Sequence, residues 1–529
     1  MSSLARATAV MSFGTVLSRI TGLLRLGAIV AALGVAESRL PDTYNLANTA
    51  PNIIYELILG GILTSVFVPV FVELLEKEGR DRAWQVASAL INIAVVVLTA
   101  VTVIGIAAAP LVAKFYALRC AGCEVQQAEI LTLLLRLFIP QIIFYGLAAM
   151  TAGLLNSHKR FGAPMYTPVL NNLAVIAVFI AFHQAFGNVT LERVTTQQLL
   201  VVGLGTTAGV VLMAVAQLPF LRGLGRYRFT LAVRHPSIRK LARLSVFVIG
   251  YVVTNQVGYL VVQWLANRQQ GGYSAYVAAF TFFLLPQGLF AVSIFTALLP
   301  GMSEHAVNER WDEFRARLST GVRATFFLIL PAAIGYFVLG EPVVRLLQRG
   351  VMTDRSTELV ADVLRFFVIG LVPFSIFQLF LRAFYALQDT RTPFLINCVA
   401  TVVNLGMNVA FFEILRVRGL ALGHAVSYVI GMLLQGRVLS ERIGGLDLRR
   451  VLRSAVKTVG AGVGMGALVW LTSRLLEDNM TFTSFGLQVV GVIVPVLVGV
   501  VSYLGLAYLL RVEEMKQVAG LVGRRISGR

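Results

Sequence analysis

The chain has 529 residues, of which 57% are hydrophobic and only 13% are charged. Soluble proteins carry about twice this charged fraction, so the composition excludes a water-soluble body and predicts an integral membrane protein. The formal net charge of +19 comes from short basic blocks between long apolar runs. This pattern indicates loops that face anionic lipid head groups and argues against nucleic-acid binding.

The N-terminal segment is expected to remain as a helix. Arg19 and Arg25 interrupt its apolar stretch, and no clear cleavage site precedes the next span, which argues against a signal peptide. Three cysteines exclude a disulfide-dense fold, and five isolated histidines offer no zinc or haem site, so we predict no metal and no cofactor. Cys120 and Cys123 lie in a predicted outward loop, where a small local disulfide or no role is expected.

Fourteen apolar segments are long enough for a helix to cross a bilayer, which takes about 20 residues. The predicted spans lie near 10–34, 44–72, 87–113, 128–155, 164–183, 198–220, 243–265, 273–300, 322–340, 360–386, 393–413, 419–441, 453–473 and 484–510. The first, second and tenth are the least uniform. Lys and Arg are concentrated in the alternate loops on the side of both termini, which predicts that both termini are cytoplasmic.

An internal repeat appears at an offset near 230 residues. The segment ELILGGILTSVFVPVFVE at 56–73 aligns with QGLFAVSIFTALLPGMSE at 287–304. The offset holds six spans, and an even number predicts two parallel six-helix lobes around a central cavity. We therefore predict an all-α membrane protein with an N-terminal lobe, a basic cytoplasmic linker, a C-terminal lobe, and two extra helices with a basic tail, at 1–221, 222–242, 243–442 and 443–529.

Two arginines lie inside the first span. Arg19 and Arg25 are about 9 Å apart along a helix axis and about 120° apart around it, and Gly22 between them permits a bend. Charges at this depth usually face an aqueous cavity or a partner. Because the planar fork of arginine suits phosphate, we interpret the pair as a cationic site for an anionic group. The alternative is a structural ion pair with Asp42 or Glu56.

Polar groups in other spans extend this hypothesis. Glu56 lies after Pro51 and before Gly60-Gly61 in a second span that we expect to be irregular. We interpret Glu56 as a counter-ion to a span 1 arginine, with a proton carrier as the alternative. Asn52 and Tyr55 are candidates to line the same cavity. In later spans, amides such as Asn404 and Asn408 usually hold helices together. A cation site made of Asn255, Asn404 and Asn408 is the weaker reading, because no carboxylate accompanies them.

Several segments together resemble the MurJ (MviN) lipid II flippases of the MOP exporter superfamily. They are LSRITGLLR, APNII, the Gly-Gly…VPVF run, FAVSIFTALLP and FYALQDTRTP, and the resemblance covers essentially the whole chain. It implies 14 spans and outward transport of the peptidoglycan precursor, a disaccharide-peptide on undecaprenyl pyrophosphate. It also implies a bacterial inner-membrane transporter rather than an enzyme, whose partners are this substrate, membrane lipids and other cell-wall synthesis proteins.

The resemblance also assigns roles to residues. Arg19 and Arg25 match the arginines that meet the pyrophosphate, and the last two spans match a groove proposed to take the lipid tail. Asp42, Asn52 and Ser274 match family residues that line the central cavity, and we expect Ser18, Tyr55 and Glu56 to line it beside them.

This sequence departs from the family pattern at positions where arginines or a glutamate are common. Tyr55-Glu56 in span 2 and Thr281 and Leu284 in span 8 leave a less positive cavity. The departure admits a flippase for another polyprenyl-linked glycan or a MATE-like cation-coupled exporter. Two alternatives belong to functional classes other than transport. One is a polyprenyl-dependent glycosyltransferase that uses Asp42, and the other is a non-transporting scaffold protein. Because no Walker glycine loop occurs, we expect membrane potential or an ion gradient to drive transport.

Overall fold

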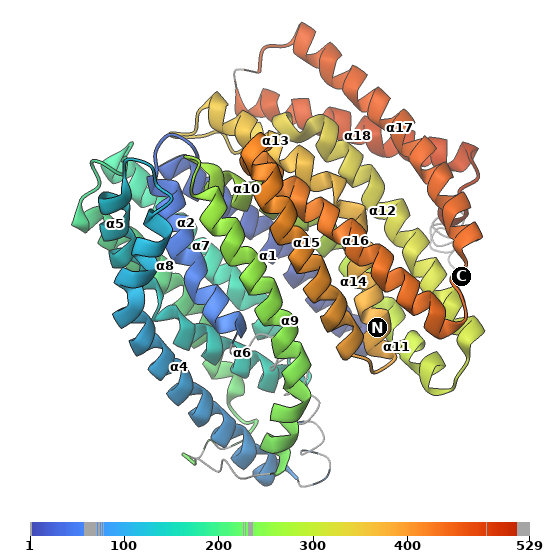
Figure 1. Ribbon diagram of the computed structural model, residues 1–529, viewed down its shortest axis with the longest axis horizontal. Coiled ribbons are helices and arrows are strands. Elements are labelled where there is room, and N and C mark those ends of the chain that lie inside the picture. Colours follow the sequence, from blue (N-terminus) through green and yellow to red (C-terminus); the bar gives the residue numbers. More distant parts are fainter. Residues whose placement is uncertain are drawn as a thin grey trace. The chain divides into compact units, whose positions relative to one another are not determined.

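The computed structural model describes residues 3–57, 71, 75, 77, 79–225, 227, 229–230, 236–482 and 484–515. Within these ranges the chain forms helices and loops and no β-strand, which confirms the predicted all-α fold (Figure 1). Eleven helical segments there are long and apolar enough to cross a membrane, and one bent pair makes twelve. The predicted spans 44–72 and 243–265 are not among them. The first of these includes residues 58–70, which lie outside the described part, and the second lies within the helix Pro236–Ala266. The count of fourteen therefore stays a prediction.

The chain divides into two compact units, which we describe separately. The first comprises residues 1–274 together with 349–353. Its helices are α1 (Ser3–Leu33), α2 (Leu40–Tyr55), α4 (Arg80–Ala117), α5 (Glu124–Phe138), α6 (Gln141–Ser157), α7 (Gly162–Phe186), α8 (Thr196–Val215), the short η3 (Leu218–Leu221) and α9 (Pro236–Ala266). Helix α1 packs on α7, and α5 and α6 pack on α2, α4 and α8.

The second unit comprises residues 275–348 and 354–529. Its helices are α10 (Gly272–Pro286, whose first turn belongs to the first unit), η4 (Gln287–Ala291), α11 (Val292–Val307), α12 (Trp311–Arg345), α13 (Asp354–Ile369), α14 (Leu371–Ala386), α15 (Arg391–Leu415), α16 (Val417–Ile443), α17 (Leu448–Asn479) and α18 (Phe485–Leu509). Helices α13 and α14 pack on α12 and α16.

The order of helices repeats along the chain. The start of α9 follows that of α1 by 233 residues, and the start of α15 follows that of α7 by 229. The internal packing repeats too: α4 with α5, α5 with α8 and α6 with α8 correspond to α12 with α13, α13 with α16 and α14 with α16. These observations support the sequence repeat. That the two copies are parallel stays a prediction.

Two of the three least uniform predicted spans, the second and the tenth, are irregular where the structure describes them. Span 10 is broken at Gly370 into α13 and α14, which meet at a bend of 48°. A Cβ atom at Gly370 would lie 2.6 Å from the Cα of Ala425 in α16, so the close approach of α16 requires glycine there. Span 2 contains Pro51 and passes into a π-turn at Glu56 and Leu57. In contrast, α1 is one helix from Ser3 to Leu33.

The two helices outside the repeat pack against the second unit. Helices α17 and α18 contact each other and α12 (Figure 1). Their interface buries apolar side chains, namely Phe327, Leu339, Ala461, Met465, Val469, Tyr503, Ala507 and Val512. The compact units divide the chain after Ser274, whereas the predicted lobes, which rest on the repeat, divide it at the linker 222–242. Those boundaries stay a prediction.

Candidate functional site

The two arginines of α1 have different surroundings. Arg19 is exposed, whereas Arg25, almost two turns further along, is half-buried. The Arg25 guanidinium lies close enough to the hydroxyls of Tyr44 and Tyr145 to interact with both. Among the described residues, neither arginine forms an ion pair with Asp42 or Glu56, so this structure does not contain the alternative ion pair.

Tyr44 is held rigidly beside Arg25. Its ring is 1% exposed and packs edge-on against Phe138 and Phe179, with centroids 5.6 and 5.2 Å away. Its hydroxyl shares a hydrogen bond of 3.1 Å with Thr206 Oγ1. A buried aromatic ring with a satisfied hydroxyl has little freedom, so the hydroxyl is a fixed polar neighbour of the arginine.

Tyr145 brings two further predicted residues to the same place. The Asn52 amide lies close enough to the Tyr145 hydroxyl to interact with it, and the Tyr55 ring lies 5.8 Å from the Tyr145 ring. Glu56, the next residue, is exposed. The first unit therefore groups Arg25, Asn52 and Tyr55 around Tyr145. We call Arg25, Tyr44, Asn52, Tyr55 and Tyr145 the arginine cluster.

Ser18 belongs to the contact between α1 and α7. Its carbonyl oxygen accepts a 3.3 Å hydrogen bond from Asn172 Nδ2, which also donates to Thr21 Oγ1 at 3.0 Å. The Ser18 side chain itself is half-buried. A Cβ at Gly22 would also meet Asn172, at 3.8 Å, so this part of α1 is supported by α7.

Asp42 and Ser274 meet in a separate hydrogen-bonded site. The Asp42 carboxylate is fully buried and accepts from the backbone N–H of Gly271 at 2.7 Å and of Ser274 at 2.8 Å. Asn45 Nδ2 donates to Ser274 Oγ at 3.0 Å. A carboxylate at the first turn of α10 satisfies amides that the helix leaves unpaired and complements the helix dipole. Asp42 thus holds the start of α2 to the start of α10.

A buried network beside this site consists of residues that the sequence analysis did not single out. Gln127 Nε2 donates to Asn267 Oδ1 at 3.1 Å, and Asn267 Nδ2 donates to the Tyr116 carbonyl at 2.9 Å. Tyr273 donates to Thr49 Oγ1 at 3.0 Å and accepts from Gln263. Gln127, Asn267 and Thr49 stand next to other polar residues in the sequence, so no local pattern singled out this network.

Two of the three candidate cation residues contact each other within the second unit. Asn408 Nδ2 donates to Asn404 Oδ1 at 2.8 Å, and Asn404 Nδ2 donates to Ser427 Oγ in α16 at 3.4 Å. This arrangement supports their role in packing α15 on α16. Asn255 lies in α9, in the other compact unit. The described residues hold no group of three or more His, Cys, Asp or Glu placed for a metal.

The four remaining positions have local partners or apolar surroundings. Thr281 donates to the carbonyl of Val277 at 2.8 Å, and Leu284 is half-buried. Cys120 and Cys123 are joined in a disulfide after α4. Thr281 and Leu284 therefore leave two positions of α10 uncharged where charged residues are common in the resembled family.

Comparisons with known proteins identify the family. A family model described as lipid II flippase MurJ matches residues 29–491. A Haemophilus influenzae protein named probable lipid II flippase MurJ is 28% identical over 471 residues, covering 86% of this chain and 90% of its own length. A Burkholderia cenocepacia protein named lipid II flippase MurJ is 29% identical over 479 residues, covering 88% and 90%.

Solved structures share the fold. A lipid II flippase MurJ in an inward closed conformation matches with a TM-score of 0.76 at 23% identity, covering 95% of this chain and 99% of its own. An inward-facing multidrug resistance transporter of the MATE family matches with a TM-score of 0.67 at 12% identity, covering 82% and 98%. Because the family model matches most of the chain, this multi-pass membrane protein belongs to the lipid II flippase MurJ family.

Proposed function

We propose that this protein moves lipid II, the lipid-linked peptidoglycan precursor, from the cytoplasmic to the outer leaflet of the bacterial inner membrane by alternating access. Its family is a family of flippases rather than enzymes. The orientation with both termini cytoplasmic belongs to the proposal, as does association with other cell-wall synthesis proteins.

The observation that carries the proposal is the arginine cluster. Arg25 is half-buried in the membrane-spanning part of α1 and lies beside two tyrosine hydroxyls rather than a carboxylate. A guanidinium presents parallel N–H donors to two oxygens of a phosphate, and phenolic hydroxyls can donate to the others. The cluster therefore supplies donors for a pyrophosphate. Arg19, exposed about 9 Å along α1, supplies a second cation.

The other predicted cavity residues take positioning roles in this scheme. Asn52 and Tyr55 hold Tyr145 in place, and Asp42 with Ser274 joins α2 to α10, so that a movement of α10 is transmitted to α2. Glu56 is exposed beside Tyr55 and would repel a pyrophosphate, which places the anion on the Arg25 side of Tyr145.

Membrane potential is the proposed driving force. Inside-negative potential favours outward movement of an anion by about 2.3 kcal/mol per charge per 100 mV. Because Thr281 and Leu284 add no positive charge in α10, less electrostatic attraction must be overcome when the anion is released. The cation site of Asn255, Asn404 and Asn408 would add ion coupling, but the packing role of the last two speaks against it.

The test is complementation in a bacterium depleted of its own lipid II flippase, read out as exposure of undecaprenyl-linked precursor at the outer leaflet. We expect the wild-type chain to restore exposure and the Arg19→Ala/Arg25→Ala double variant to fail at equal membrane abundance. Arg193→Ala, at an exposed loop arginine, is the matched control. A fully active double variant would contradict the assignment of Arg19 and Arg25 to the pyrophosphate site.

Two related functions are separate outcomes of the same system. If the wild-type chain is inserted yet inactive on lipid II, exposure of other polyprenyl-linked glycans tests the alternative substrate. The MATE-type fold relation suggests a cation-coupled exporter, which would expel a cationic dye and stop when the ion gradient collapses. Dye export without precursor exposure would replace the flippase proposal.

A further inference from the structure

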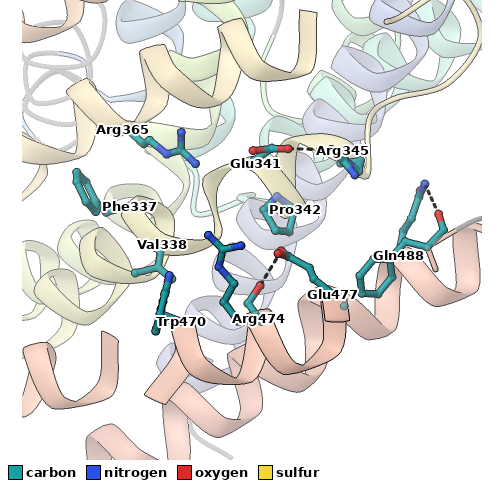
Figure 2. Close-up of a pocket in the computed structure, with 13 residues that line it drawn as sticks. Phe337, Val338, Glu341, Pro342, Arg345, Arg365, Trp470, Arg474, Glu477 and Gln488 are labelled. Atoms are coloured by element: carbon teal, nitrogen blue, oxygen red, sulfur yellow. Dashed lines mark hydrogen bonds and ion pairs between the residues drawn. The ribbon is translucent and has the colours of Figure 1, made fainter. Parts of the chain in front are cut away.

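A cavity of about 810 Å³ in the second unit shares no residue with the arginine cluster (Figure 2). It is bounded by α12 and α13 on one side and by α17, α18 and their connection on the other. Five of its lining residues are charged: Glu341, Arg345, Arg365, Arg474 and Glu477. Such a lining does not match an all-carbon prenyl tail, which needs apolar walls.

The cavity lies at the ends of membrane-spanning helices. Glu341 and Arg345 occupy the last turns of α12, Arg474 and Glu477 lie within two turns of the end of α17, and Gln488 lies in the first turn of α18. Helices α12, α17 and α18 are all long and apolar enough to cross a bilayer. Because helix ends lie at the membrane–water interface, the cavity is at head-group depth.

The walls combine aromatic side chains with a fixed loop. Trp470 and Phe337 are each 54% exposed, so their rings are available to lipid chains, as is typical of the aromatic belt at an interface. Gln488 Nε2 donates to the Phe482 carbonyl at 3.4 Å, which pins the connection between α17 and α18. A Cβ at Gly491 would lie 2.7 Å from the Phe482 ring, so that ring closes directly onto α18.

Two of the arginines already pair with carboxylates. Arg345 pairs with Glu341 at 2.8 Å, and Arg365 pairs at 2.9 Å with Asp362, which also pairs with Arg418 at 2.7 Å. Even so, Arg345 Nε is shielded from solvent and has no hydrogen-bond partner among the described residues. These pairs make the wall polar without giving it a large net charge.

Arg474 and Glu477 are the charged groups that remain for a ligand. In Figure 2 both side chains extend from α17 toward α12. Arg474 lies over the Trp470 ring at 5.8 Å, and Glu477 accepts a 3.3 Å hydrogen bond from Ser473. Neither takes part in an ion pair with any described residue. One cation and one anion, three positions apart on α17, therefore face the same cavity.

We propose that this cavity binds the head group of a zwitterionic phospholipid that carries a phosphate and a primary ammonium, as in phosphatidylethanolamine. The phosphate is held by Arg474, the ammonium by Glu477, and the acyl chains lie over Trp470 and Phe337. The opposite charges and their spacing favour this lipid over an anionic one, because Glu477 would repel a second negative group. The site is independent of the proposed flippase activity and does not require it.

Native mass spectrometry of the full chain in detergent tests the proposal. The protein is titrated with phosphatidylethanolamine, its N-acetyl derivative and phosphatidylglycerol, and competition is measured with inorganic phosphate and glycerophosphoethanolamine. We expect Arg474→Gln to weaken phosphatidylethanolamine binding about tenfold, the effect of losing one charge-assisted hydrogen bond. Arg453→Gln, an exposed arginine on the same helix, should leave binding unchanged.

The second variant separates zwitterion recognition from simple charge attraction. We expect Glu477→Gln to abolish the preference for phosphatidylethanolamine over its N-acetyl derivative, while Asp478→Asn, the exposed neighbour, preserves it. An unchanged preference in Glu477→Gln, or tighter binding of phosphatidylglycerol or cardiolipin by the wild type, would overturn the proposal. So would competition by the soluble phosphates at the lipid's own concentration, which would assign the cavity to a free anion.

Discussion

The same pair of aromatic rings occurs in both compact units, but in different surroundings. Tyr44 of α2 packs edge-on against Phe138 of α5 with centroids 5.6 Å apart. Tyr276 of α10 packs on Phe367 of α13 at 4.9 Å, also edge-on, and lies 232 residues after Tyr44. This offset is the offset of the helices, so the two pairs occupy matching places of the repeat.

The neighbours of the two pairs differ in polarity. Tyr44 has the Thr206 hydroxyl and Arg25 beside it. Phe367 is instead surrounded by Phe280, Phe283 and His424, all with ring centroids within 5.5 Å. The repeat offset of 233 places Gly258 at the position of Arg25. The scaffold thus repeats, but the arginine of the first copy has no counterpart at the matching position of α9.

The second unit has a buried arginine of its own, and its contacts show how such a charge is neutralised. Arg323 in α12 is 2% exposed and pairs with Glu514 at 2.7 Å and with Glu513. Ser454 donates to Glu514 at 2.7 Å, and Arg450 donates to Glu513 at 2.9 Å. Arg450, followed by the charge of Arg323, lowers the pKa of the Glu513 carboxyl. Arg323 is thus held in ion pairs, whereas Arg25 forms none with the residues that the structure describes.

The largest expected effect is on stability at Arg323. Replacing it with Met should lower the free energy of unfolding by about 3–5 kcal/mol, because Glu514 would stay buried without its counter-charge. Unfolding of the purified protein in detergent measures this. Arg437→Met, which breaks an exposed pair with Glu441, should change stability by less than about 0.5 kcal/mol. Equal effects of the two variants would contradict the structural role of Arg323.

The next effect is on transport at Arg25. Arg25→Ala should reduce precursor exposure at least about a hundredfold, about 2.7 kcal/mol in the transport barrier, with little change in the unfolding midpoint. Arg25→Lys should restore part of the activity, because it keeps the charge but loses the planar fork. If Arg25→Ala instead destabilises the protein as Arg323→Met does, the comparison between the two arginines fails.

Asp42 should show an intermediate effect. Asp42→Asn replaces a charged acceptor of two backbone amides by a neutral one, which costs about 1–3 kcal/mol. Hydrogen exchange should accelerate at the amides of Gly271 and Ser274 and not at distant sites. Glu192→Gln, in an exposed loop, serves as the control. Unchanged exchange at both amides would show that Asp42 does not hold the start of α10.

The smallest effect is expected at Asn408. Asn408→Leu removes the hydrogen bond to Asn404, worth about 0.6 kcal/mol between membrane helices. Thermal unfolding should show a correspondingly small shift, and the dependence of transport on ion gradients should be unchanged. Loss of that dependence with unaltered stability would favour the cation site of Asn255, Asn404 and Asn408 over the packing role.

Local sequence patterns were enough for part of the candidate site. Arg25 stands out because an arginine in an apolar helix is costly, and Asn52 and Tyr55 lie close to it in the next span. Tyr145 and Thr206 could not be found this way, since an isolated tyrosine or threonine in an apolar helix is common. Arg323 lies inside the predicted span 322–340 and was not singled out, because its partners follow 190 and 191 residues later.

The sequence by itself determined the membrane class, the helical fold, the repeat and the presence of charge in the first span. Each of these depends on composition or on residues close together in the chain. Only the tertiary structure decided how buried charges are stabilised. Asp42 accepts hydrogen bonds from backbone amides 229 and 232 residues away, and Arg323 forms ion pairs with Glu513 and Glu514. The physical reason is that a buried charge is stabilised by whatever polar group packing brings to it, and helix packing joins residues that no local pattern relates.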